Sequence, residues 1–200
     1  MAASFQGNFR AIAFDFDGTL VDTLHLHYEA YRQVFAFMGL SLSEDQFYSN
    51  IGGKATEAIP LFLAGREAPL TIEEIHRRKK IVVGALFLDA PLHVLPAASL
   101  LPLLMGRLPL ALVSSGSRPG IEQLLGRLGW SDFFEVIVTG EDTEQSKPSP
   151  QPYLLAAEKL RIDPANIAVF EDTVAGIESA RRAGMSVFDV SANNSILSLP

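Results

Sequence analysis

The chain has 200 residues, 48% apolar and 20% charged, which is enough for one sizeable core or for one core with a small appended module. The chain has 16 Lys and Arg against 23 Asp and Glu, which gives a net charge of −7. Because this charge repels a phosphate backbone, we do not expect nucleic acid as a partner. The absence of cysteine excludes disulfides, thiolate metal sites and cysteine nucleophiles, and fits a reducing compartment.

The N-terminal residues show no basic segment followed by a long apolar run, so we expect no secretory signal and a cytoplasmic location. The most apolar stretch, Leu95–Val113, has the length of a membrane span, but Pro96, Pro102, Pro109 and Arg107 interrupt it. We therefore expect a buried helix, a turn and a buried strand in this stretch, and no membrane as a partner.

Short, evenly apolar runs separated by helical patterns indicate a parallel sheet that helices cover on both faces. The runs predicted as strands are Ala11–Phe14, Leu110–Val113, Val136–Val138, Ile167–Phe170 and Ser186–Val190. After the second strand, the predicted crossover helices are Arg118–Leu128, Pro150–Arg161 and Thr173–Ala183. The sequence therefore predicts an α/β fold.

Almost one hundred residues separate the first two predicted strands, which is far more than a crossover requires. Their pattern is helical, and the prolines of Asp89–Pro96 mark the return to the sheet. We therefore predict a core domain of residues 1–22 and 92–200 and an inserted helical domain of residues 23–91. The helices expected in the insertion are Leu24–Met38, Ala55–Leu63 and Ile72–Leu88.

Two carboxylates follow the first strand in the segment AIAFDFDGTLVDT. Asp15 and Asp17 are two positions apart on extended chain, so their side chains face the same way at the carboxyl end of a strand, where α/β folds bind ligands. Carboxylates about 4 Å apart repel by roughly 4 kcal/mol at an effective dielectric near 20, so the pair requires a cation or a shared proton. Mg²⁺ suits oxygen ligands and phosphate. The alternative is a simple turn after the strand.

Polar side chains also follow three other strands. At the second strand, Ser114 leads into a helix start where hydroxyls and amides can hold a phosphate, although serine capping alone explains this segment equally well. Lys147 precedes a proline-rich turn, from which it could neutralise a phosphate oxygen or a nucleophile, although an isolated loop lysine is usually only solvated. The strand Ile167–Phe170 is followed by Glu171 and Asp172, a second acidic pair that could complete an oxygen-ligated metal site.

Together, DFDGTLVDT, the Ser114 strand end, Lys147 in KPSP, and EDTVAGIESARRAGM resemble the four ordered motifs of the haloacid dehalogenase superfamily across about the whole chain. The helical insertion resembles the small cap of the beta-phosphoglucomutase-like subgroup. This resemblance implies a Rossmann-like core with an α-helical cap. One departure is Gln151, because relatives commonly carry aspartate in a KPxPD pattern.

The resemblance also implies roles for individual residues. Asp15 would be the nucleophile that forms an aspartyl-phosphate, and Asp17 would be the acid for the leaving oxygen and then the base for water. Ser114 and Lys147 would hold the phosphoryl group, together with Gly18, Thr19, Ser115 and Gly116. Mg²⁺ would be bound by Asp15, the Asp17 carbonyl and Asp172, with Glu171 ligating directly or through water. The presence of Asp17 disfavours carbon–halogen hydrolysis.

Substrate identity should depend on the cap. The candidate substrate-binding residues there are His27, Gly53, Lys54 and Lys79, and for each of them exposure or ordinary packing is the alternative. The basic stretch His76–Lys80, which contains Lys79, is typical of the solvated face of a helix. By the resemblance His27 is linked to cap closure, whereas Lys54 departs from the arginine that the mutase carries near this loop.

We therefore expect a Mg²⁺-dependent phosphatase that acts on a small phosphorylated metabolite, preferably a sugar phosphate, as a monomer or weak homodimer. One alternative is a phosphosugar mutase, which uses the same aspartates but returns the phosphoryl group to a sugar. Another is a non-catalytic module that only captures phosphorylated ligands, against which the complete acidic set argues.

Overall fold

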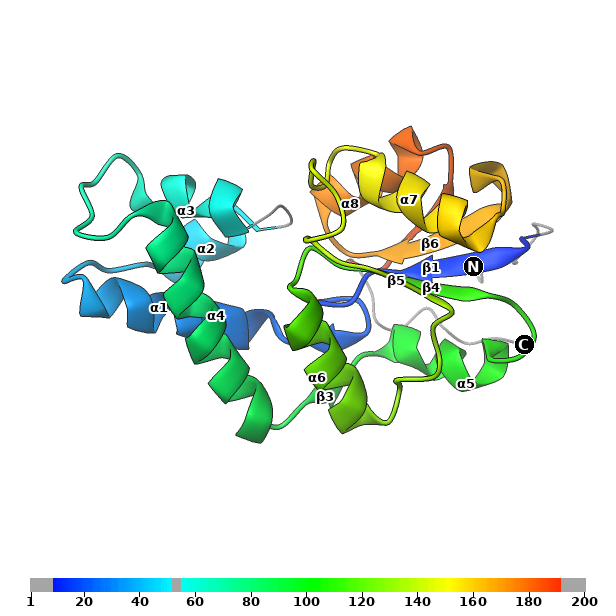
Figure 1. Cartoon of the computed structure of the whole chain (residues 1–200), viewed down its shortest axis with the longest axis horizontal. Helices are drawn as coiled ribbons and strands as arrows, with labels where there is room; N and C mark the ends of the chain where they lie inside the picture. Colours follow the sequence, from blue (N-terminus) through cyan, green and yellow to red (C-terminus); the bar gives the residue numbers. More distant parts are fainter. Residues whose placement is uncertain (1–8, 52–54, 192–200) are drawn as a thin grey trace.

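The protein, described here by a computed structural model over residues 9–51 and 55–191, is built on a five-stranded sheet in which every pairing is parallel. The strand order is β5-β4-β1-β6-β7 (Figure 1). The strands are β1 Ala11–Phe14, β4 Leu110–Val113, β5 Val136–Val138, β6 Ile167–Glu171 and β7 Ser186–Asp189.

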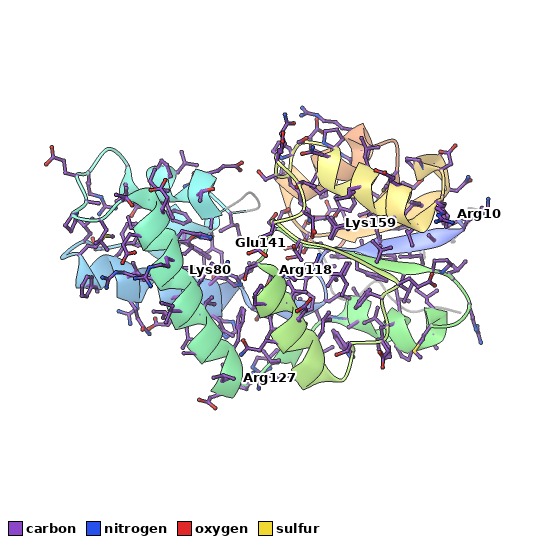
Figure 2. The ribbon with its side chains drawn as sticks, viewed as in Figure 1. Arg10, Lys80, Arg118, Arg127, Glu141 and Lys159 are labelled. Atoms are coloured by element: carbon purple, nitrogen blue, oxygen red, sulfur yellow. The ribbon has the colours of Figure 1, made fainter. Side chains whose placement is uncertain are left out.

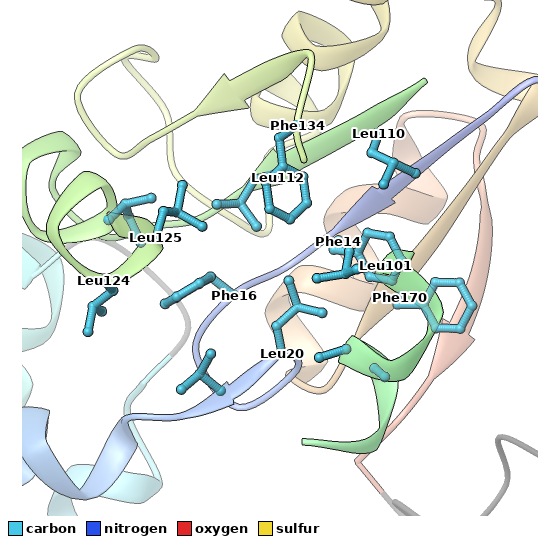
Figure 3. Close-up of a cluster of buried hydrophobic side chains, with 14 of the residues drawn as sticks. Phe14, Phe16, Leu20, Leu101, Leu110, Leu112, Leu124, Leu125, Phe134 and Phe170 are labelled. Carbon is cyan, nitrogen blue, oxygen red and sulfur yellow. The ribbon is translucent and has the colours of Figure 1, made fainter. Parts of the chain in front are cut away.

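The central strands are buried on both faces because alternate side chains enter two different cores. In β1, Ile12 and Phe14 pack into the core shown in Figure 3, which also contains Phe16, Leu101 and Phe170. The other β1 side chains enter a smaller core with the residues of α7 and α8. This double burial explains why the strands appear in the sequence as continuous apolar runs.

Helices cover both faces of the sheet, with α5 and α6 on one side and α7 and α8 on the other (Figure 1). The 3-10 helices η1 and η2 precede α5 and β6. The bounds are η1 Pro96–Leu100, α5 Leu101–Leu104, α6 Arg118–Leu128, α7 Gln151–Leu160, η2 Pro164–Asn166 and α8 Val174–Arg182.

The helices between residues 24 and 89 form a separate body beside the sheet (Figure 1). Its core of buried side chains is rich in aromatic rings, with Phe47 and Phe62 at a centroid distance of 5.7 Å. A short antiparallel pair, β2 Val21–Asp22 and β3 His93–Val94, lies where the chain leaves and re-enters the sheet. The helices are α1 Leu24–Phe37, α2 Glu44–Tyr48, α3 Ala55–Leu63 and α4 Ile72–Asp89.

The predicted α/β class is confirmed, with a parallel core sheet and inserted helices. The pair β2 and β3 and the helix α2 were not predicted, because two-residue strands and a five-residue helix carry too little periodicity to stand out. The Leu95–Val113 stretch forms η1, α5 and β4, as expected. In the described part of the chain, no helix is long and apolar enough to cross a membrane.

Candidate active site

Side chains from four segments meet at the carboxyl end of the sheet. Asp15 follows β1, Ser114 follows β4, and Glu171 ends β6. Lys147, from the loop before α7, reaches the same place and donates to the carbonyl oxygen of Val113 at 3.0 Å. The residues predicted from separate motifs therefore converge, as expected where parallel strands end side by side.

The centre of the site is a buried ion pair. Nζ of Lys147 donates to Oδ1 of Asp15 at 2.6 Å and lies 3.4 Å from Oε1 of Glu171. Burial and the Glu171 charge raise the pKa of Asp15 well above its usual range, and Lys147 opposes that shift. Burial lowers the pKa of Lys147, but the charges of Asp15 and Glu171 outweigh burial and raise this pKa well above its usual range. Lys147 is thus a buried ammonium held by two acids.

Three acids form a cluster suited to a divalent cation. Oxygen atoms of Asp15, Glu171 and Asp172 lie within 4.8 Å of one another. Burial, followed by the charge of Glu171, raises the pKa of Asp172 to about 6. Three carboxylates beside the single ammonium of Lys147 carry a charge of −2 when all are ionised, which a divalent cation would neutralise. The donor set therefore fits a divalent metal ion.

Two glycines allow these carboxylates to take their places. Gly18 has a φ of +91°, and a Cβ there would overlap the carboxylate of Asp172. Gly176, in α8, approaches Glu171 so closely that a Cβ would overlap that carboxylate as well. The hydroxyl of Thr19 donates to Oδ1 of Asp172 at 2.8 Å, so this predicted phosphate-binding residue contacts a predicted metal ligand.

Asp17 has a separate set of partners. The hydroxyl of Thr23 donates to Oδ1, the hydroxyl of Ser114 donates to Oδ2 at 3.3 Å, and Nε2 of His27 lies 3.4 Å from Oδ1. Burial alone would raise the pKa of Asp17, but His27, Thr23 and the charge of Lys79 lower it to about 2. Asp17 is therefore an ionised carboxylate that can accept a proton.

The segment after β4 forms a wall of the site. Oγ of Ser114 accepts from the backbone N–H of Gly116 at 2.9 Å, while Ser115 and Gly116 line the cavity at the start of α6. Polar groups at a helix start favour an anion. The predicted phosphate cradle is thus adjacent to Asp15 and Asp17.

On the cap side, two of the predicted substrate-binding residues contact each other. Nζ of Lys79 lies 2.7 Å from Nδ1 of His27 and 5.2 Å from the centroid of the Tyr31 ring. Burial lowers the pKa of Lys79 to about 8, with Asp17 opposing the shift, and burial also lowers the pKa of His27. The solvated-face interpretation of the basic stretch is therefore wrong for Lys79, which is only 7% exposed.

A cavity that is partly open to solvent lies between the sheet and the cap helices. Asp15, Asp17 and Lys147 line one end, and His27 and Lys79 line the cap side. Gly53 and Lys54 lie outside the described residues.

Several contacting residues were missed by the sequence analysis. Thr23 is fully buried against Asp17, and its position in the DFDGTLVDT motif was an available signal. The ring centroid of Tyr153 lies 5.1 Å from Nζ of Lys147, and His76 lines the cavity. Nothing in the local sequence distinguishes these two from ordinary helix residues.

An acidic nucleophile candidate, a buried lysine and an ionised second aspartate at the end of a parallel sheet define a phosphoryl-transfer type of site. The family model of haloacid dehalogenase-like hydrolases matches residues 12–190. The chain therefore belongs to the haloacid dehalogenase-like hydrolases, as the motifs predicted.

Phosphatases of known name and a solved structure resemble this chain over most of its length. The chain is 34% identical over 179 residues to the phosphorylated carbohydrates phosphatase of Thermotoga maritima, covering 88% of this chain and 82% of that protein. It is 32% identical over 183 residues to fructose-1-phosphate phosphatase YqaB of Escherichia coli, covering 91% and 96%. The crystal structure of CbbY from Rhodobacter sphaeroides in complex with phosphate superposes with a TM-score of 0.85 at 28% identity, covering 96% and 90%. The predicted enzyme class, a phosphatase of this family, is confirmed.

Proposed function

We propose that this chain is a Mg²⁺-dependent phosphatase that hydrolyses a small sugar phosphate through an aspartyl-phosphate on Asp15. The observation that carries the proposal is the buried contact between Lys147 and Asp15 beside Glu171 and Asp172. In this contact the ammonium of Lys147 offsets the negative charge of the proposed nucleophile, Asp15. A bound phosphoryl group would add further negative charge at the same place. The sugar-phosphate phosphatases among the relatives support the substrate class.

In the first step, a carboxylate oxygen of Asp15 forms a bond to phosphorus while the bond from phosphorus to the leaving-group oxygen breaks. Lys147 favours the ionised form of Asp15, because its ammonium donates to Oδ1. Ser115 and Gly116, which line the cavity, and the adjoining Ser114 would receive the phosphoryl oxygens near the start of α6. The departing oxygen takes a proton from Asp17, which leaves Asp17 ionised.

In the second step, ionised Asp17 takes a proton from water, and the water oxygen attacks phosphorus to release phosphate and regenerate Asp15. A pKa of about 2 keeps Asp17 ionised, which is the form that the base role requires. The acid role of the first step requires a protonated Asp17, and the negative charge of a bound phosphate raises the pKa of a neighbouring carboxylate in the required direction.

Asp15, Glu171 and Asp172, with the backbone carbonyl of Asp17, would hold Mg²⁺, which would offset the negative charge of the phosphoryl group. Carboxylate oxygens are the ligands that this ion prefers. Thr19 orients Asp172 by its hydrogen bond, and Gly18 and Gly176 leave room for the two carboxylates. The preference for Mg²⁺ over other divalent ions is part of the proposal.

Residues 23–91 are proposed to act as a cap that covers the cavity and contacts the leaving group. The exposed ion pair between Lys80 of α4 and Glu141, at 2.9 Å, joins the cap helices to the loop after β5 (Figure 2). A hydrogen bond from Ser146 to Glu57 of α3 joins them a second time. Water exclusion under such a cap favours phosphoryl transfer.

The experiment is a phosphate-release screen of purified protein with Mg²⁺ and a panel of sugar phosphates, repeated with Asp15→Asn. We expect release from at least one sugar phosphate and none above background with the variant, because an amide is a poor nucleophile. Release by a contaminant-free Asp15→Asn protein would refute the nucleophile assignment. Isomerised phosphosugar without released phosphate would favour the mutase alternative.

A further inference from the structure

One histidine on the cap side of the cavity has no part in the proposed chemistry. His76, in α4, lines the cavity that Asp15 lines at its other end. Its Nδ1 is buried and has no hydrogen-bond partner, and neither ring nitrogen has a partner in the described part of the chain. A buried polar atom without a partner costs free energy. A ligand in the cavity could supply the missing hydrogen bond.

Each described lysine that lines the cavity already has a partner. The partner is either a carboxylate or a histidine that itself lies beside a carboxylate. Lys147 is held by Asp15, and Lys80 is held by Glu141 (Figure 2). Lys79 contacts the His27 ring, whose other nitrogen lies 3.4 Å from Asp17. Among the described residues, the cap side therefore offers a second phosphate no unmatched lysine, and a second phosphate that bound one of these lysines would have to displace an existing contact.

The remainder of the cap-side wall is mostly apolar. Such a wall favours a leaving group with one weakly hydrated face, as the C–H face of a sugar ring has. Its side chains are Leu24, Phe47, Ile51, Phe62, Val83 and Phe87.

We propose that His76 is a specificity-determining residue that hydrogen-bonds a hydroxyl of an uncharged leaving group, so that the cavity selects sugar monophosphates over bisphosphates. This inference rests on the proposed phosphatase function and names the substrate class of the same site. Burial, with the charges of Lys79 and Lys80, lowers the pKa of His76 and so favours the neutral ring. A neutral imidazole can accept from a hydroxyl at one nitrogen and donate at the other.

The first test compares His76→Ala with the unchanged protein on two kinds of monoester. For the sugar monophosphate that is hydrolysed fastest, we expect kcat/KM to fall about tenfold, the size of one hydrogen bond to an uncharged group. For phenyl phosphate, whose leaving group has no further hydroxyl, we expect no change. His93→Ala is the matched control, because His93 is exposed and outside the cavity lining. An equal fall on both substrates would overturn the assignment.

Conservative variants separate recognition from packing. Gln at position 76 places an amide near Nε2, and Asn places one near Nδ1. We expect one of His76→Gln and His76→Asn to recover most of the sugar monophosphate activity while phenyl phosphate hydrolysis stays constant. Failure of both to recover activity, with unchanged thermal stability, would overturn the hydrogen-bonding role.

A comparison of fructose 1-phosphate with fructose 1,6-bisphosphate at saturating Mg²⁺ tests the expected preference for monophosphates. We expect kcat/KM to be about tenfold higher for the monophosphate, since the bisphosphate brings a second charged group and no lysine among the described cavity residues is left unmatched to receive it. An equal or higher value for the bisphosphate would overturn the preference. If the unchanged protein hydrolysed neither phenyl phosphate nor any sugar phosphate, the proposed phosphatase function would be refuted, and the role of His76 would be refuted with it.

Discussion

The ammonium of Lys147 lies 2.6 Å from Oδ1 of Asp15, although 132 positions separate the two residues in the chain. Both side chains are nearly inaccessible to solvent, at 2% and 9% exposure. A charge pair in such surroundings is sensitive to the loss of either member, because the remaining charge is left buried without a partner. The pair therefore gives a sharp test of the site.

We expect Lys147→Met to lower kcat by about a hundredfold or more, since a positioned positive charge at the reacting group is removed. Without that charge the pKa of Asp15 rises further, so less of the carboxylate is ionised at neutral pH. Steady-state phosphate release with saturating Mg²⁺ measures this. Lys159→Met, in the last turn of α7 and exposed, is the control and should keep full activity. Activity of Lys147→Met within a few fold of the unchanged protein would contradict the assigned role.

Asp17→Asn should separate metal binding from turnover. Its side chain contacts Thr23, Ser114 and His27. The acidic cluster is instead made by Asp15, Glu171 and Asp172. We expect the Mg²⁺ affinity measured by calorimetry to change little, while kcat falls by about 10²- to 10⁴-fold through loss of the proton-transfer group. Equal losses of affinity and turnover would show that the side chain, and not only its backbone, holds the metal.

Much of the site could be predicted because each functional side chain follows a recognisable strand. Asp15, Ser114 and Glu171 all come directly after apolar runs, and parallel strands bring their carboxyl ends together. The prediction of Lys147 as a site residue depended on the order of the motifs, because the sequence around a single loop lysine does not show that it is buried. The strand Ile167–Phe170 was predicted within one residue of its observed end at Glu171.

The cap-side contacts could not be predicted, because they depend on how helices turn relative to one another. Lys79 meets His27 across 52 positions of sequence, and a single basic stretch does not reveal which of its members faces inward. His76 and Lys79 are three positions apart on α4 and therefore share a face, which became meaningful only when the cavity was seen beside it. Tyr153 likewise lies near Lys147 only because α7 packs under the site.

Metal should stabilise the protein more at neutral than at acidic pH. The folded-state pKa of Asp172 is raised from 3.8 to about 6, so the folded protein binds more protons than the unfolded chain between these values. Without metal, ionised Asp172 therefore costs stability above pH 6, and stability rises as the pH falls toward 4. A shift of about two pKa units corresponds to about 3 kcal/mol.

We therefore expect Mg²⁺ to raise Tm by several degrees at pH 7.5 and by much less at pH 5, relative to protein in a chelator. Thermal melts at the two pH values, with and without Mg²⁺, measure this. Asp172→Asn removes both a ligand and the titrating group, so its melts should respond weakly to Mg²⁺ at either pH. A response of the unchanged protein that does not vary with pH would count against ligation by this acidic cluster.

Gly176→Ala should impair the site although alanine is the better helix former. A Cβ at Gly176 would overlap the Glu171 carboxylate, which is fully buried and 3.4 Å from Nζ of Lys147. We expect a loss of about 1–3 kcal/mol from this overpacking and weaker Mg²⁺ binding. Gly126→Ala is the matched control, because Gly126 is exposed in α6 with open space around its Cα, and it should stabilise by about 0.5–1 kcal/mol. Chemical denaturation of both variants decides, and a stabilised Gly176→Ala protein would refute the close approach.

Arg127 ties the end of α4 to the core domain proposed from the sequence. Lying in the last turn of α6, it donates from Nη1 to the carbonyl oxygen of Phe87 and from Nη2 to that of Ala90 at 3.0 Å (Figure 2). These carbonyls lie at the C-terminal end of α4, where backbone acceptors have no partner within the helix and a cation interacts favourably with the helix dipole.

We expect Arg127→Met to lower the free energy of unfolding by about 1–2 kcal/mol, because methionine keeps the apolar stem but supplies no donor. The matched comparison is again Lys159→Met, a cation in the last turn of α7 that should change stability by less than about 0.5 kcal/mol. Urea unfolding of the two variants gives the difference. Because α4 also carries His76 and Lys79 into the cavity, Arg127→Met should raise KM for a sugar phosphate more than it lowers kcat with Mg²⁺ saturating. Equal stability of the two variants would show that the helix end is held by packing alone.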